Sequence, residues 1–98
     1  MNTERTAIFY MANLGSEVAR YLSALGENNS GAARDAWQRI KGICSDAFSL
    51  GSAGPSRTEV EALLSFIENP AQSGLPIAEV EDECEAYFMP FALKLLKT

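Results

Sequence analysis

Residues 3–25 read TERTAIFYMANLGSEVARYLSAL and carry the clearest helical pattern in the chain. Apolar or small residues alternate spacings of three and four, as one buried face of a helix requires, at Ile8, Met11, Gly15, Val18, Leu22 and Leu25. Leu14 and Tyr21 widen this stripe. Gly15 has two interpretations: its missing side chain lets another helix approach closely, or it weakens the helix locally.

Three further segments show the same periodicity and predict helices at about residues 31–50, 56–69 and 76–97. Short connections between consecutive helices favour antiparallel neighbours. The sequence therefore predicts an all-α, antiparallel up-down-up-down four-helix bundle, with residues 1–98 forming one domain. We expect the fourth helix to be kinked near Pro90, because a proline removes a backbone hydrogen bond inside a helix.

Residues at the predicted helix starts support these boundaries. Asn29 or Ser30 is suited to cap the second helix with its side-chain oxygen. Ser56 and Glu59 form a capping-box pattern at the start of the third helix. Pro76 fits the first position of the fourth helix, where a backbone N–H has no partner in any case.

The composition is that of a small, acidic, globular protein: 47% of residues are hydrophobic and the formal net charge is −5. A negative chain is a poor match for nucleic acid or for an anionic membrane surface, which both attract clustered Lys and Arg. The sequence shows no apolar run of membrane-spanning length and no signal-peptide pattern at its start. Two cysteines do not make a disulfide framework. We expect a cytoplasmic location.

The sequence lacks the residues that most enzyme classes need. It has no histidine, which removes the commonest general base and most transition-metal ligand sets. Neither the Walker A pattern nor the dinucleotide-binding glycine pattern occurs. We therefore predict no catalytic residues and no cofactor, and favour a non-enzymatic protein.

Residues 79–85, EVEDECE, gather five carboxylates around Cys84. Successive helical residues lie about 100° apart, which turns Cys84 toward the core and sends most of the carboxylates away from it. Only Glu81 and Glu85 project to a common point. Carboxylates in the first turns of a helix interact favourably with its dipole, so a structural role is preferred. The alternative is a divalent-metal or nucleotide-processing site that uses Glu81 and Glu85.

Cysteines and aromatic residues on the inner helix faces are expected in the core. Cys44 and Cys84 both occupy inner faces and are predicted to be buried, unreactive thiols. Trp37 also lies on a core face. An alternative function is a small-molecule pocket within the bundle, lined by Tyr21, Trp37 and Tyr87.

The segment after Pro90 has apolar residues outside the core face of the fourth helix: Met89, Leu93 and Leu96. Phe9 lies outside the apolar stripe of the first helix, next to Tyr10. The two chain ends of an up-down-up-down bundle lie together, so these residues are expected to form one apolar patch. Such patches commonly mark association sites. The alternative is that the chain end frays, or that Pro90 shifts the helix phase and both stripes face one core.

These observations predict a small helical-bundle protein that self-associates and binds an unidentified protein partner through apolar helix faces. A homodimer is the expected oligomer, because two-fold dimers are the commonest soluble assemblies. The predicted interface residues are Phe9, Tyr10, Met89, Leu93 and Leu96. Nucleic acid and membrane are not expected as partners.

Overall fold

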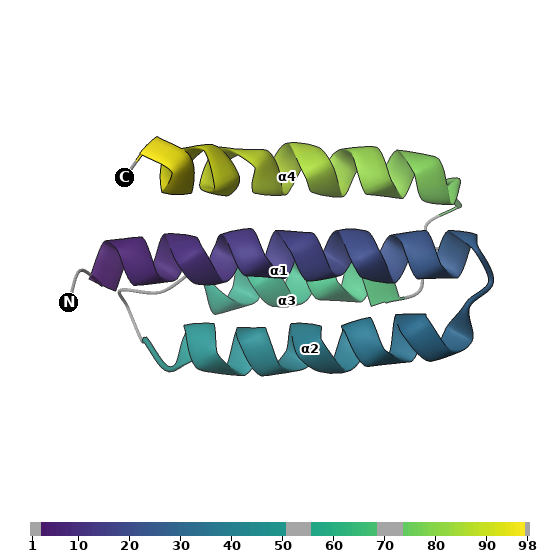
Figure 1. The fold of residues 1–98 in the computed structure, drawn as a ribbon, viewed down its shortest axis with the longest axis horizontal. Helices are drawn as coiled ribbons and strands as arrows, with labels where there is room; N and C mark the ends of the chain where they lie inside the picture. The colour runs from purple at the N-terminus through teal and green to yellow at the C-terminus, as the bar shows by residue number, and fades with distance from the viewer. Residues whose placement is uncertain (1–2, 51–55, 69–73, 98) are drawn as a thin grey trace.

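A computed structural model of the chain describes residues 3–50, 56–68 and 74–97. Nearly all of these residues lie in helices, which are α1 (Thr3–Gly26), α2 (Ser30–Phe48), α3 (Arg57–Glu68) and α4 (Ile77–Lys97). Successive helices run in opposite directions, and both ends of the chain lie at the same end of the bundle (Figure 1). The predicted all-α four-helix bundle is therefore confirmed.

The helices begin and end within two residues of their predicted bounds, although residue 69 lies outside the described part. Asn29, not Ser30, caps α2: its side-chain oxygen accepts a hydrogen bond from the Ala32 N–H at 3.1 Å. Ser56 caps α3, because its Oγ accepts from the Glu59 N–H at 3.4 Å. Local side-chain chemistry thus sets both helix starts, as the sequence suggests.

α1 is the central helix of the bundle. It lies between α2 and α4, with α3 behind it in the view of Figure 1, and it contacts both α2 and α4 extensively. A helix with neighbours on several sides buries a wide arc of its surface. Glu17 and Ala24 are accordingly buried in addition to residues of the predicted stripe, whose ends Ile8 and Leu25 are half-buried. The buried residues of α1 are Met11, Leu14, Glu17, Val18, Tyr21, Leu22 and Ala24.

At Gly15, α1 and α4 approach each other closely. A Cβ atom built at Gly15 would lie 2.7 Å from Cβ and 2.8 Å from Cγ of Phe88, closer than carbon atoms can pack. Of the two interpretations open from the sequence, close helix approach is thus confirmed. The absent side chain lets Phe88 seat directly on the α1 backbone.

α4 turns its predicted face toward the core, where Val80, Cys84 and Phe88 are buried. They join Val60 and Ile67 of α3 and the buried face of α1 in one hydrophobic cluster. The helix continues through the exposed Pro90 to Lys97 without interruption. The bend expected at Pro90 remains a prediction.

Candidate interaction surface on α1 and α4

Four large apolar side chains are exposed near the end of the bundle where the chain begins and ends. The exposed fractions are 50% for Phe9, 43% for Met89, 47% for Leu93 and 83% for Leu96. All four were predicted from sequence to lie outside the core, and their exposure is confirmed. Tyr10 is instead half-buried and meets the Phe9 ring edge-on, with ring centroids 6.2 Å apart. Their role as an interface stays a prediction.

The exposed residues of α4 lie outside its core face, which other apolar residues already occupy. Val80, Cys84 and Phe88 follow one another at four-residue spacing and are buried, while Phe91 and Leu95 extend the same side half-buried. Met89 and Leu93 are offset from that row by one or two residues, which turns them about 100–200° away. α4 therefore presents a second apolar stripe that the described part of the chain does not cover.

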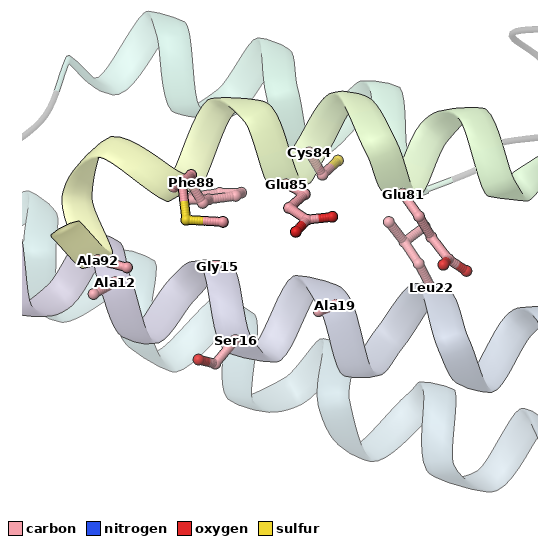
Figure 2. Close-up of a pocket in the computed structure, with 11 residues that line it drawn as sticks. Ala12, Gly15, Ser16, Ala19, Leu22, Glu81, Cys84, Glu85, Phe88 and Ala92 are labelled. Atoms are coloured by element: carbon pink, nitrogen blue, oxygen red, sulfur yellow. The ribbon is translucent and has the colours of Figure 1, made fainter.

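A groove of about 330 Å³ runs between α1 and α4 (Figure 2). Its floor is formed where Gly15 meets Phe88, and its α1 wall consists of the small residues Ala12, Ser16 and Ala19 together with Leu22. The lining residues are Ala12, Gly15, Ser16, Ala19, Leu22, Glu81, Cys84, Glu85, Phe88, Met89 and Ala92. Sequence reasoning missed this groove, although the small residues of α1 recur at helical spacing and carried the signal.

Met89 belongs both to the groove lining and to the exposed apolar residues, and Leu93 and Leu96 follow it on α4 at spacings of four and seven residues, on the same side of the helix. We call the groove together with the exposed apolar residues the α1/α4 face and define it by Phe9, Ala12, Ser16, Ala19, Glu81, Glu85, Met89, Leu93 and Leu96. Its apolar end comprises Phe9, Met89, Leu93 and Leu96. Glu81 and Glu85 form its acidic end, farther along the groove and opposite Ala19 and Leu22 (Figure 2).

Glu81 and Glu85 both line the groove from α4, one helical turn apart (Figure 2), and their convergence on one cation stays a prediction. Among the described residues neither carboxylate forms an ion pair. The described part of the chain also holds no group of three or more Cys, Asp or Glu side chains placed to bind a metal ion. Glu81 and Glu85 are thus two exposed carboxylates on the groove, and no third Cys, Asp or Glu among the described residues completes a metal site with them.

Cys84 lines the groove, but its thiol is poorly suited to act as a nucleophile or a metal ligand. Both Cys84 and Cys44 are buried and unpaired, on helices that lie on opposite sides of α1. Burial raises the pKa of Cys44 from 9.0 to about 11. Burial, helped by the charge of Glu83, raises the pKa of Cys84 to about 11 as well. Both thiols therefore stay protonated near neutral pH and act as small core residues, as predicted.

The proposed aromatic pocket is only partly assembled. Tyr21 and Trp37 lie with ring centroids 5.1 Å apart and line a shallow hollow of about 290 Å³. Tyr87 does not line that hollow, because its hydroxyl donates to Oε1 of Glu59 at 2.7 Å. Burial and this hydrogen bond raise the pKa of Tyr87. The three residues predicted to line one pocket therefore do not share one.

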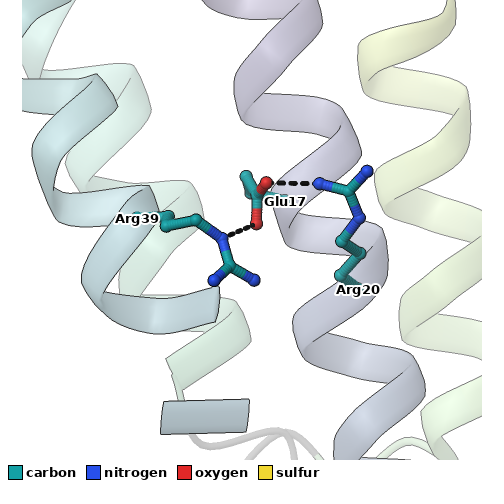
Figure 3. A network of polar contacts seen from close by, with 3 residues as sticks. All are labelled: Glu17, Arg20 and Arg39. Atoms are coloured by element: carbon teal, nitrogen blue, oxygen red, sulfur yellow. Dashed lines mark hydrogen bonds and ion pairs between the residues drawn. The ribbon is translucent and has the colours of Figure 1, made fainter. Parts of the chain in front are cut away.

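Glu17 is a buried carboxylate that sequence reasoning missed. Its side chain is 10% exposed and accepts hydrogen bonds from Arg20 and, at 2.7 Å, from Nε of Arg39 (Figure 3). Arg39 comes from α2, so this network joins α1 to α2. The hollow beside it is lined by charges of both signs, including Glu27, and favours no particular ion.

No protein-family model, curated protein or solved structure matches this chain. In the described part of the chain, no helix combines the length and the apolar character needed to cross a membrane.

Proposed function

We propose that this chain is a small, non-enzymatic cytoplasmic protein that self-associates and binds a protein partner through its α1/α4 face. The observation that carries this proposal is the apolar end of the face. Four large apolar side chains of α1 and α4 are each at least 43% exposed, and one of them, Met89, lines the groove between these two helices. Covering apolar surface is favourable by about 25 cal/mol per Å², so this face is stabilised by a partner.

Self-association is proposed as a two-fold homodimer in which the apolar end of one copy covers that of another. The same residues then meet across the axis, as a two-fold interface requires. The acidic ends of both copies point away from the contact and remain in water. The two buried, unpaired cysteines support a cytoplasmic location, because free thiols persist in reducing compartments.

Analytical ultracentrifugation of the wild-type chain and of Leu93→Ser/Leu96→Ser tests this proposal. We expect a dimer for the wild type and a folded monomer for the variant, since both leucines are exposed in the single chain. Leu75→Ser is the control: Leu75 is 38% exposed but lies just before α4, at the other end of the bundle. A wild-type chain that stays monomeric at high micromolar concentration overturns self-association.

A further inference from the structure

The α1/α4 groove has the dimensions of a helix-binding site. From Ala12 to Leu22 it follows α1 for ten residues, which at 1.5 Å per residue is about 15 Å, or three helical turns. From Ala12 to Ala19 its α1 wall presents the small side chains of Ala12, Ser16 and Ala19, and the larger Leu22 lines its far end. Small residues at a contact allow two helix axes to come close together. A fifth helix can therefore lie in the groove against α1 and α4.

The two ends of the groove differ in chemistry, and this difference specifies the occupant. Ala12 and Ala92 line one end, where apolar anchors of a bound helix find apolar surface (Figure 2). Glu81 and Glu85 line the other end, and among the described residues neither has a cationic partner. A helix with apolar side chains at one end and Lys or Arg at the other is complementary to both.

A second copy of this chain does not fit this groove. If two copies meet through their apolar ends alone, as proposed above, the carboxylates remain in water, and if the two faces overlap fully, each pair of carboxylates faces the apolar end or the carboxylates of the other copy. Neither arrangement neutralises Glu81 and Glu85. Arg20 and Arg39 do not do so either, because both are paired with Glu17.

We propose that the groove between α1 and α4 binds one amphipathic helix of a partner protein, with basic residues of that helix against Glu81 and Glu85. This inference rests on the proposed interaction role of the α1/α4 face and names the chemistry of the partner. In helix-in-groove recognition of this kind, apolar side chains at helical spacing bind in the groove. Charges at the ends of the groove determine the direction in which the helix lies.

The test uses two fluorescent helical peptides of about 15 residues, a length that covers the groove. Both carry Leu at one helical face, and they differ only in two terminal Lys or two terminal Glu residues. Binding is measured by anisotropy, and its location by amide NMR shifts, on the Leu93→Ser/Leu96→Ser variant so that self-association does not compete. We expect the Lys peptide to bind about tenfold more tightly than the Glu peptide, as two partly exposed charge pairs allow.

Two variants of equal charge locate the effect. Glu81→Gln/Glu85→Gln should weaken the Lys peptide about tenfold, whereas Glu79→Gln/Glu83→Gln, on exposed positions outside the groove, should not change its affinity. NMR shifts should cluster at Ala12, Ser16 and Ala19. Equal affinity of the two peptides, equal effects of the two variants, or no binding at about 1 mM peptide overturns the inference. Sedimentation of the wild type decides self-association separately, so either proposal can fail while the other stands.

Discussion

α1 contacts α2 along one side and α4 along the other, and the two contacts are built differently. On the α2 side, long side chains cross the boundary: Glu17 binds Arg39, and Tyr21 packs on Trp37. On the α4 side, Gly15 brings the backbone against Phe88, and the small residues beside it leave a groove. The size of the side chains along each edge of α1 thus decides which side is bridged and which stays open to a partner.

The largest expected effect tests how strongly the contact between Phe88 and Gly15, which forms the floor of the groove, stabilises the fold. Phe88 is 6% exposed and seats on Gly15, so Phe88→Ala should lower the free energy of unfolding by about 3–5 kcal/mol. Met89→Ala, one residue along at the rim, should cost less than about 1 kcal/mol, because Met89 is 43% exposed. Urea denaturation at low protein concentration measures both. Similar losses for the two variants would mean that the rim, not the floor, holds α4 in place.

The second test breaks the close approach itself. Gly15→Ala places a methyl group 2.7 Å from Cβ of Phe88 and should destabilise the fold by about 1–3 kcal/mol through overpacking. Gly42→Ala on α2 is the matched control, since no atom lies within 4 Å of its added methyl group. The control should stabilise the protein by up to about 1 kcal/mol, because alanine is the better helix former. Thermal unfolding compares the two, and stabilisation by both would show that α1 and α4 can separate freely.

This pair of glycines shows how far the sequence could predict the fold. Helical periodicity and capping residues were sufficient to place the four helices, because those signals are local. Gly15 lies within the apolar stripe of α1 and Gly42 lies at an exposed position of α2, but only the position of Phe88 shows that α4 approaches Gly15 closely. Glu17 was missed for the same reason: its burial depends on α2 lying over the edge of α1 that carries it.

The candidate site was predictable in part. The exposure of Phe9 and Leu93 followed from helical phase alone, since each lies off a face that is filled by other apolar residues. The groove was not predicted, because it depends on two helices and on how closely they approach. Tyr87 shows the converse error: it lies on an inner face but contacts Glu59 of α3, away from Tyr21 and Trp37. Contacts between helices decide such details, and one sequence does not contain their geometry.

The third prediction tests whether the groove side of α1, facing α4, and the side facing α2 shield their buried thiols from water equally well. Cys84 lies at the groove and Cys44 on α2, and burial raises the pKa of each from 9.0 to about 11. A raised folded-state pKa contributes stability that is complete below pH 9 and is lost as the pH rises from 9 toward 11. We expect a loss on the order of 1 kcal/mol per thiol at about pH 10.

Urea denaturation at a series of alkaline pH values measures this loss. Cys44→Ala and Cys84→Ala should each make the decline with pH shallower by a similar amount, whatever their effect on stability at neutral pH. If only Cys44→Ala does so, the groove admits water to the Cys84 thiol, and the floor formed by Phe88 is looser than the bridged side.

The smallest expected effect concerns the bridge on the α2 side. Glu17→Gln removes the charge that Arg20 and Arg39 share, and should cost about 1 kcal/mol. The cost is modest because the side chains of Arg20 and Arg39 are 64% and 51% exposed, so neither is left as a buried charge. Glu61→Gln is the control on α3, where the pair with Arg57 is exposed on both sides and should contribute at most about 0.5 kcal/mol.

A double-mutant cycle of Glu17→Gln with Arg39→Gln isolates the link between α1 and α2. We expect a coupling energy of about 0.5–1 kcal/mol that persists in high salt, because the carboxylate is sheltered from solvent. A coupling near zero would mean that Glu17 is held by Arg20 within α1 alone. The contact between Tyr21 and Trp37 would then be the remaining side-chain bridge among those described here, and the bridged side would depend on packing as the groove side does.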